Sequence, residues 1–380
     1  MKTVFLSNYY NHHQAPFSEA MYKLTQGEYR FIACEQIEAE RVKMGWGEIE
    51  PRFVLHLDES YKECIELIEN ADVVIFGSAP YELVRSRIKK KKITFIYTER
   101  IDKKKEDLLR FIKHYFDYNV MYRFHSSLFC LCASAYTSYD FSKRRCFINK
   151  AYKWGYFPVV KKYEEINKLV EDKEPASILW TGRLIGLKHP DASIRLAVRL
   201  KEEGFRFKLR IIGNGEMQVH LQKMIEENNL CDCVQMLGSM KPNQVREYME
   251  KSQIFLFTSD RNEGWGAVLN ESMNSGCTVI ASHAIGSVPF LLTNGVNGLV
   301  YCDGNEEELF QKVKYALDNQ MMCKSMGGKA YETLVDAWNA EEAARRLLLL
   351  IDDLENNGKS DRFENGPCSK AEIIKDGWYR

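Results

Sequence analysis

The sequence predicts an α/β protein made of two consecutive domains, each with a parallel sheet. Strand-like apolar runs alternate with helix-length amphipathic stretches along nearly all of the 380 residues, which is the pattern of repeated βαβ units. A charged connector that follows Pro158 and ends near Pro175 separates two such series. At roughly 100–200 residues per domain, the length also favours two domains.

The first series contains short runs of β-branched and aromatic residues bounded by polar or turn residues. Their separations leave room for crossover helices, as a parallel sheet requires. Residues 35–60 are less regular and contain one further candidate strand, Val54–Leu57. The predicted strands are Thr3–Ser7, Tyr29–Cys34, Asp72–Phe76, Ile93–Thr98 and Leu128–Ser134.

The second series repeats the alternation after the connector, and several of its strands end in glycine or small polar residues. Such ends are typical of a ligand-binding edge. Helices are expected near 190–203, 216–228, 243–251, 266–275, 305–319 and 339–353. The predicted strands are Ser177–Thr181, Lys208–Ile212, Val234–Leu237, Ile254–Thr258, Thr278–Ser282 and Gly298–Cys302.

These series predict an N-terminal domain over 1–160, a second domain over 161–354 and an irregular tail over 355–380. The aromatic pair Trp378 and Tyr379 suggests that the tail docks back on the body. Two α/β sheets joined by a connector are expected to face a cleft, where small-molecule sites are most often found.

Composition excludes several classes of protein. The chain carries 53 basic and 53 acidic residues, and a zero net charge argues against a generic nucleic-acid binder, which needs a basic excess. Eleven cysteines without any C-x-x-C pair favour a reducing cytoplasm and buried thiols over disulfides or zinc. The N-terminal apolar run is too short for a secretory signal, and no 18-residue apolar stretch exists.

The segment from Thr258 to Ser282 carries the most chemical information. It begins at a strand end, passes through a loop with Gly264 and Gly266, and enters a helix that bears Glu271. Glu263 and Glu271 are eight residues apart and can face one crevice, while the helix start favours an anion such as phosphate. Carboxylates beside an anion site suggest a phosphorylated sugar or a nucleotide sugar. The alternative is that Glu263 caps the helix and Glu271 lies on a solvated face.

Two neighbouring strand exits add to this segment. Gly182, Arg183 and Lys188 follow one predicted strand, and two cations in one loop suit a diphosphate, although such a pair is also a common surface cluster. Gly213 and Gly215 follow the next strand, but no G-x-G-x-x-G fingerprint is completed, which argues against a nicotinamide cofactor. Ser239 and Met240 follow a third strand and could offer backbone groups to a nucleotide base.

The order T-G-R-L…K, I-G-N-G-E, L-G and E-G-W-G-x-V-L-N-E-S-M-x-S-G-x-x-V-I-A-S closely resembles the donor half of family-4 (group 1) retaining glycosyltransferases of the GT-B fold. G-x-x-P-x-L-L and N-G-x-L-V extend the resemblance, which covers roughly residues 176–320. It implies two Rossmann-like domains, with the acceptor bound by the first and the nucleotide-sugar donor by the second.

The resemblance also implies residue roles. Arg183 and Lys188 would hold the diphosphate, Glu263 would accept hydrogen bonds from the donor sugar, and Glu271 would hold the ribose. No metal or other cofactor is implied, and no D-x-D motif occurs. The predicted donor-binding set is Gly182, Arg183, Lys188, Gly213, Gly215, Met240, Glu263, Gly264, Trp265, Gly266, Ala267, Val268 and Glu271.

The first half departs from the family pattern. In place of a glycine-rich loop after the first strand it has His12, His13 and Gln14, and a middle strand is followed by Glu99 and Arg100. Both sets are predicted to face the acceptor; the alternatives are a helix cap and an exposed ion pair. Adding His13 and Glu99 to the donor-side residues gives the candidate catalytic set, which is Glu263, Arg183, Lys188, Glu99 and His13.

A basic segment lies in the same half. Twelve basic and four acidic residues lie between Arg85 and Lys113, and the overlapping stretch 100–116 has an amphipathic pattern with Leu108, Leu109, Ile112 and Phe116 on one side. This segment is predicted either to contact anionic lipid headgroups at the inner face of the cell membrane or to form a solvated basic face.

The function that follows is metal-independent transfer of a sugar from a nucleotide-diphosphate sugar to a saccharide hydroxyl, with retention of configuration. The acceptor is expected to be a lipid-linked precursor of a cell-surface polysaccharide, and the location cytoplasmic. Two alternatives remain open: a sugar phosphorylase or nucleotide-sugar epimerase on the same scaffold, and a protein that binds nucleotide sugars without catalysis.

Overall fold

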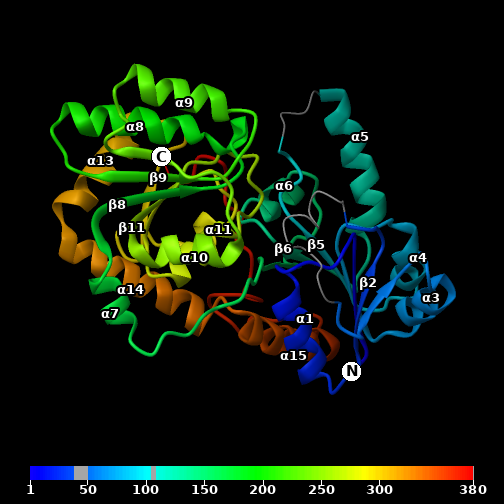
Figure 1. The fold of residues 1–380 in the computed structure, drawn as a ribbon. Helices are drawn as coiled ribbons and strands as arrows, with labels where there is room; N and C mark the ends of the chain where they lie inside the picture. Colours follow the sequence, from blue (N-terminus) through cyan, green and yellow to red (C-terminus); the bar gives the residue numbers. More distant parts are fainter. Residues whose placement is uncertain (38–49, 104–107, 380) are drawn as a thin grey trace. The chain divides into compact units, whose positions relative to one another are not determined.

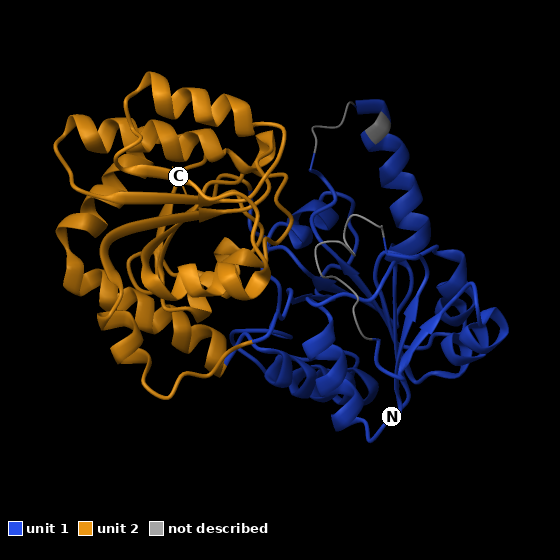
Figure 2. Cartoon of the chain, viewed as in Figure 1, with its two compact units in different colours: residues 1–159, 337–375 blue, residues 160–336, 376–380 orange. Residues whose placement is uncertain are grey.

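The structure is a computed structural model that describes residues 1–37, 50–103 and 108–379. The chain forms two compact units, which Figure 2 colours separately. Unit 1 comprises residues 1–159 and 337–375, and unit 2 comprises residues 160–336 and 376–380. The change of unit at 159/160 lies beside the predicted boundary, but the later segment 337–375 returns to unit 1.

Unit 1 is built on a parallel sheet in the order β3-β2-β1-β4-β5-β6-β7. Its strands read as continuous apolar runs because helices cover both faces; all five residues of β6, for example, are buried. The strands are β1 (Thr3–Ser7), β2 (Tyr29–Ala33), β3 (Val54–His56), β4 (Val73–Phe76), β5 (Thr94–Thr98), β6 (Leu128–Cys132) and β7 (Ala151–Lys153).

The helices of unit 1 follow its strands in turn and end with one long helix from the far end of the chain (Figure 1). They are α1 (Ala15–Leu24), α3 (Tyr61–Asn70), α4 (Glu82–Lys89), α5 (Leu108–Tyr118), the π-helical turn η1 (Asn119–Arg123), α6 (Thr137–Ser142) and α15 (Ala340–Asn357).

Unit 2 has a parallel sheet in the order β10-β9-β8-β11-β12-β13. The first strand, β8, lies in the middle with β9 on one side and β11 on the other, so the strand order reverses there. The strands are β8 (Glu174–Thr181), β9 (Lys208–Ile212), β10 (Val234–Met236), β11 (Ser252–Phe257), β12 (Thr278–Ser282) and β13 (Leu299–Tyr301).

The helices of unit 2 flank this sheet, and its core is a continuous cluster of aliphatic and aromatic side chains. They are α7 (Ile166–Glu171), the 3-10 turn η2 (Gly186–Lys188), α8 (Pro190–Glu202), α9 (Gln218–Glu227), α10 (Pro242–Lys251), α11 (Val268–Asn274), α12 (Val288–Leu291), α13 (Glu306–Asp318) and α14 (Gln320–Asp336).

The predicted α/β class with two parallel sheets is confirmed, but several elements and one boundary differ from the expectation. β7, α12 and α14 were not predicted, and α7 lies in the stretch predicted as a connector. α15 was assigned to the second domain through residue 354, whereas it packs against α1 in unit 1 (Figure 1). The physical reason is its apolar face, in which Leu347, Leu350 and Ile351 are fully buried. Sequence periodicity reveals such a face but not which sheet layer it covers.

The segment after α15 has little regular secondary structure, yet its backbone is hydrogen-bonded. In unit 1 it runs beside β7. The amide of Lys153 donates to the carbonyl oxygen of Ser369 at 2.7 Å, and the carbonyl oxygen of Lys153 accepts from the amide of Cys368 at 2.8 Å. In unit 2, Tyr379 contacts Val300. In the described part of the chain, no helix is both long and apolar enough to cross a membrane.

Candidate active site

The loops that follow the strands of unit 2 gather at one edge of its sheet because the strands are parallel. Backbone hydrogen bonds join three of them: the amide of Leu184 donates to the carbonyl oxygen of Asn214 at 2.8 Å, and the amide of Asp260 donates to that of Leu187 at 3.0 Å. Residues 182–189, 213–217 and 258–267 therefore form one group, which we call the β8–β9–β11 loop cluster. It contains most of the predicted donor residues.

An ion pair between Lys188 and Glu263 lies at the centre of this cluster. Lys188 Nζ contacts Glu263 Oε2, which also accepts a hydrogen bond from Ser259 Oγ at 3.0 Å. The two side chains are only 16% and 13% exposed. Thr258 Oγ1 donates to the carbonyl oxygen of Lys188 at 2.7 Å, which fixes the backbone beside the pair. The predicted cation and carboxylate are thus adjacent and engage each other.

Arg183 differs from Lys188 in its surroundings. Its side chain is exposed, and no ion pair engages it within the described residues. Both cations lie in the loop after β8. The guanidinium of Arg183 is open to solvent, whereas the ammonium of Lys188 is paired with Glu263. The loop can offer an anion one unoccupied charge and a second charge that Glu263 must release.

The course of the 258–267 loop depends on Gly266 and Trp265. Gly266 has a φ of +78°, and a Cβ there would lie 2.3 Å from Cζ of Phe257, so a side chain is excluded. The indole of Trp265 is fully buried and donates to Asn270 Oδ1 at 2.9 Å. The side chain of Trp265 therefore anchors the loop, and the donor contact predicted for this residue is through its backbone N–H.

Glu271 lies on α11, four residues after Ala267, the residue that caps the helix. Its side chain is half-buried; burial raises its carboxyl pKa, and the positive charge of Arg246 on α10 partly opposes that rise. Arg246 Nη1 in turn donates to Asn274 Oδ1 at 2.7 Å. Gly264, Ala267 and Val268, also in the predicted donor set, lie between the two glutamates in the sequence.

Gly213 and Gly215 allow two loops to approach closely. A Cβ on Gly213 would lie 1.8 Å from the carbonyl oxygen of Gly182, and one on Gly215 would lie 2.5 Å from that of Leu184. Both have positive φ, +140° and +155°. Backbone packing within the loop cluster is a sufficient reason for both glycines. Met240, the remaining predicted donor residue, is half-buried just before α10.

In unit 1, the structure brings His13 and Glu99 together through a residue that the sequence did not suggest. The ring of His13 stacks on that of Tyr156 with centroids 6.0 Å apart, and Tyr156 Oη donates to Glu99 Oε1 at 2.7 Å. Glu99 Oε2 accepts from Lys103 Nζ at 2.7 Å. Tyr156 follows the short strand β7 without a recognisable motif, so only the fold reveals it.

His12, His13 and Gln14 form the turn before α1. The rings of the two histidines are 3.9 Å apart. Burial, helped by the charge of His12, lowers the pKa of His13 to about 3, and burial also lowers the pKa of His12. Both imidazoles are therefore neutral at pH 7. Gln14 Oε1 is buried without a hydrogen-bond partner among the described residues.

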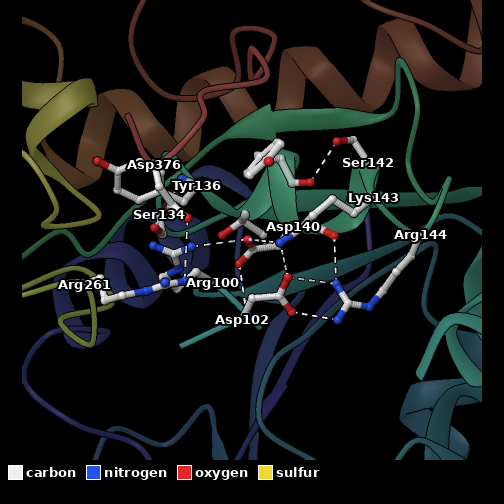
Figure 3. A network of polar contacts seen from close by, with 12 residues as sticks. Arg100, Asp102, Ser134, Tyr136, Asp140, Ser142, Lys143, Arg144, Arg261 and Asp376 are labelled. Atoms are coloured by element: carbon white, nitrogen blue, oxygen red, sulfur yellow. Dashed lines mark hydrogen bonds and ion pairs between the residues drawn. The ribbon is translucent and has the colours of Figure 1, made fainter. Parts of the chain in front are cut away.

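Arg100 does not fit its predicted acceptor role. Its side chain is fully buried and donates to Asp140 Oδ1 at 3.3 Å, and its guanidinium lies 4.8 Å from the Tyr136 ring centroid. Asp140 also accepts from the amide of Asp102, whose carboxylate is held by Arg144 through two hydrogen bonds of 2.7 and 3.0 Å (Figure 3). Arg100 is part of a buried ionic network and has a structural role there.

Among its described residues, the basic segment between Arg85 and Lys113 contains a further buried cation, Arg87. Arg87 is fully buried and donates to four carbonyl oxygens and to Thr94 Oγ1, so it ties strand and helix ends together and cannot meet a headgroup. Residues 104–107 and the side chain of Arg110 lie outside the described residues. Lys89 and Lys91 are exposed.

The described residues contain no group of three or more His, Cys, Asp or Glu placed to hold a metal ion. The loop cluster suits a ligand with negative charge and hydroxyl groups.

Comparison with solved structures identifies the fold. HepE from Anabaena, crystallised in complex with UDP, matches with a TM-score of 0.70 at 15% identity, over 93% of this chain and 100% of that one. TarM matches with a TM-score of 0.68 at 11% identity. At such identities the likeness concerns the fold alone, and it confirms the predicted GT-B fold.

Residues 161–333 match the family model of the glycosyl transferases group 1, which is the family that the sequence resembles. Similar curated proteins are the amylovoran biosynthesis glycosyltransferase AmsK of Erwinia amylovora, 29% identical over 38% of this chain and 37% of that protein, and a Campylobacter jejuni protein, 33% identical over 45% of each chain. The latter is named N-acetylgalactosamine-N,N'-diacetylbacillosaminyl-diphospho-undecaprenol 4-alpha-N-acetylgalactosaminyltransferase. The matched segment spans less than half the length of these relatives.

Proposed function

We propose that the chain is a glycosyltransferase that moves a sugar from a nucleotide-diphosphate sugar to a hydroxyl of a saccharide. The observation that carries the proposal is the loop cluster of unit 2, where the Lys188–Glu263 pair and the exposed Arg183 share one sheet edge with Glu271 nearby in sequence. The group 1 family match covers this segment. UDP in the HepE crystal and the glycosyltransferase names of AmsK and the Campylobacter protein support the same substrate class.

Different residues of the loop cluster and of α11 would bind different parts of the donor, according to charge. Arg183 and Lys188 would hold the diphosphate oxygens, since a guanidinium fork and an ammonium both favour phosphate. Glu263 would accept hydrogen bonds from the donor sugar, and Glu271 would accept them from the ribose. The donor would also be lined by the backbone amides of 264–268 and by residues that follow the strands, namely Gly182, Gly213, Gly215 and Met240.

The reaction needs no covalent intermediate with the protein. The bond between the anomeric carbon and the diphosphate oxygen breaks, so negative charge grows on the leaving diphosphate beside Arg183 and Lys188, which stabilise it. The acceptor hydroxyl oxygen forms the new bond to that carbon from the face of the leaving group, which retains configuration. Its proton passes to an oxygen of the departing diphosphate. No metal is assigned to the transfer.

Unit 1 would supply the acceptor contacts. His13, Glu99 and Tyr156 form a connected polar group at the strand ends of that unit, and Gln14 adds an acceptor atom without a partner in the described structure. A neutral imidazole, a carboxylate and an amide oxygen all accept hydrogen bonds from sugar hydroxyls. A saccharide acceptor fits this chemistry better than an anionic one.

A lipid-linked acceptor is the finer form of the proposal, and the surface of α5 supports it. Apolar side chains recur at intervals of four along α5 and η1, at Leu108, Ile112, Phe116, Val120 and Phe124, with Leu109 beside them; Leu109 is 80% exposed and Phe124 is 77% exposed. Side chains four apart lie on one helix face. We call this set the α5 stripe.

The α5 stripe would rest in the interfacial layer of an anionic membrane. Single exposed apolar residues are common, but a continuous row is not. The exposed Lys113 and Arg123 lie on the same two elements, and basic residues beside an apolar face favour anionic headgroups. In the chain as a whole, the eleven free thiols are consistent with a reducing, cytoplasmic compartment.

Vesicle sedimentation tests this finer form. Leu109→Glu combined with Phe116→Glu is expected to release the protein from phosphatidylglycerol vesicles that retain the wild type. Val219→Glu in unit 2 is the matched control, because Val219 is 82% exposed and lies on another surface. Equal retention of all three proteins would contradict the role of the α5 stripe, without bearing on sugar transfer.

Transfer itself is tested by incubating the protein with labelled nucleotide sugars, with and without a saccharide acceptor and inorganic phosphate. The proposal predicts a glycoside and an equal amount of nucleoside diphosphate, formed only with the acceptor. Sugar phosphate formed from phosphate alone would instead indicate a phosphorylase, and an interconverted nucleotide sugar would indicate an epimerase. Nucleotide binding without turnover over a broad acceptor panel would indicate a binding protein.

A further inference from the structure

The segment Asp376–Tyr379 docks on unit 2 through specific contacts. The carbonyl oxygen of Asp376 accepts a hydrogen bond from His283 Nε2 at 3.0 Å. Tyr379 Oη lies 2.5 Å from the carbonyl oxygen of Val300 and 2.8 Å from Glu308 Oε1. The rings of Tyr379 and His283 stack with centroids 5.9 Å apart and an interplanar angle of 28°. The four residues are therefore fixed to the strand ends of β12 and β13.

His283 is the central contact, and its hydrogen bonds define its tautomer. Its ring is buried, with Nδ1 accepting from the amide of Asp303 at 2.9 Å and Nε2 facing the carbonyl oxygen of Asp376. An amide can only donate and a carbonyl can only accept, so the proton resides on Nε2. Loss of Asp376 would leave a buried N–H without that partner, which is unfavourable.

The same segment reaches the loop that carries Glu263. The carboxylate of Asp376 lies 3.6 Å from Arg261, two residues before Glu263. The turn that begins at His283 also contacts this loop, because the amide of Gly286 donates to the carbonyl oxygen of Glu263 at 3.3 Å. The 258–267 loop is thus held by two contacts: the ion pair of Arg261 with Asp376, and the hydrogen bond of Glu263 with the turn that begins at His283.

We infer that Asp376 and Tyr379 are positioning residues that hold the 258–267 loop so that Glu263 and Lys188 face the donor. Neither residue touches the Lys188–Glu263 pair; each acts through Arg261 or His283. The expected effect on donor binding rests on the proposed function. The restraint on the 258–267 loop follows from the contacts alone.

Hydrogen–deuterium exchange measures the restraint directly. Two variants are compared with the wild type: a chain without residues 376–380, and the full-length Tyr379→Phe, which keeps the ring but removes the hydroxyl. Amides of 258–267 and 283–287 are expected to exchange at least about tenfold faster in the shortened chain, and less so in Tyr379→Phe. Lys375→Ala is the matched control, because Lys375 is exposed and precedes the docked segment.

Calorimetry with UDP and a panel of other nucleoside diphosphates gives the second readout. The dissociation constant of the diphosphate that the wild type binds is expected to rise about three- to tenfold in the shortened chain and to stay unchanged in Lys375→Ala. In a transfer assay the KM for the donor is expected to rise by a similar factor, with kcat changed less.

A passive anchor predicts a different result. It would lower the melting temperature and speed exchange near Val300 and Glu308, while exchange at 258–267 and nucleotide affinity stayed at wild-type values; that outcome overturns the inference. If the wild type binds no nucleoside diphosphate at all, the proposed function fails, and the exchange of 258–267 still decides whether the segment restrains the loop.

Discussion

Competition for Lys188 between Glu263 and the donor diphosphate leads to an unusual prediction. In the structure Lys188 is paired with Glu263 in a site where both side chains are largely buried. A diphosphate that recruits Lys188 must first break that pair. Glu263→Gln removes the competing charge while retaining the shape of the side chain, so it is expected to tighten the binding of a nucleoside diphosphate that carries no sugar.

The size of this effect follows from the surroundings of the pair. A charge-assisted hydrogen bond contributes about 1.5–3 kcal/mol, and removing a negative charge beside the diphosphate adds a repulsion of the same sign. Part of the gain is lost because the neutral amide still accepts a hydrogen bond from Lys188. A net gain of about 1 kcal/mol, or about fivefold in affinity, is expected. Lys188→Met should instead weaken binding by about 10- to 100-fold.

Isothermal titration with the nucleoside diphosphate is the assay, and Glu203→Gln is the matched control. Glu203 forms a 2.8 Å pair with Lys314 on a solvated surface of unit 2, so its loss should not change the affinity. Sugar transfer by Glu263→Gln should fall by about 100-fold, since the contact with the donor sugar is weakened. If Glu263→Gln weakens nucleoside diphosphate binding as much as Lys188→Met does, the competition argument is refuted.

Three further outcomes are expected. Arg183→Ala combined with Lys188→Ala should abolish transfer while the circular dichroism spectrum stays native, and near-normal rates would refute the diphosphate role. Glu271→Ala should weaken nucleoside diphosphate binding about tenfold. Because the pKa of Glu271 is raised above 4.5, binding to the wild type should decline on acidification already above pH 4.5. Calorimetry at several pH values that shows no such decline would argue against the ribose contact. Arg144→Met should destabilise unit 1 by about 3 kcal/mol in urea unfolding, since it leaves the carboxylate of Asp102 poorly compensated. Burial alone would raise the pKa of Asp102, but hydrogen bonds from Arg144 and Lys143 hold it below its ordinary value. The stability that these bonds give to unit 1 is therefore present above the ordinary pKa and is lost as the pH falls through the lowered pKa. An Arg144→Met variant with wild-type acid stability would contradict this.

The strands of both sheets could be predicted from sequence because buried parallel strands are continuous apolar runs with glycine or polar ends. β7 escaped prediction because its sequence, AYK, has one aromatic residue between an alanine and a lysine and is not a recognisable apolar run. α14 escaped because its sequence, QMMCKSMGGKAYETLVD, contains two adjacent glycines and little separation of polar and apolar faces. The return of α15 to unit 1 depends on long-range packing that no local pattern encodes.

The candidate site shows the same limit at the level of side chains. Sequence located the loops of Arg183, Lys188 and Glu263 and the helix that bears Glu271, because glycines and strand ends mark these segments. It could not show that Arg100 is paired within a buried network, because a loop position does not determine which way a side chain points. The same applies to the buried indole of Trp265.

The partnership of His13 and Glu99 also required the fold. Tyr156, which links them, lies far from both in sequence and carries no motif. The pairing of Lys188 with Glu263 was not predicted either, although both residues were, because their loops follow strands β8 and β11 that become neighbours only in the folded sheet.

A crystal structure of the chain with a nucleoside diphosphate bound tests the central claim most directly. The account predicts that the diphosphate lies within hydrogen-bond distance of Arg183 and Lys188, that the ammonium of Lys188 has left Glu263, and that the ribose hydroxyls contact Glu271. A nucleotide bound away from the β8–β9–β11 loop cluster, or bound there with Lys188 still paired to Glu263, would contradict it.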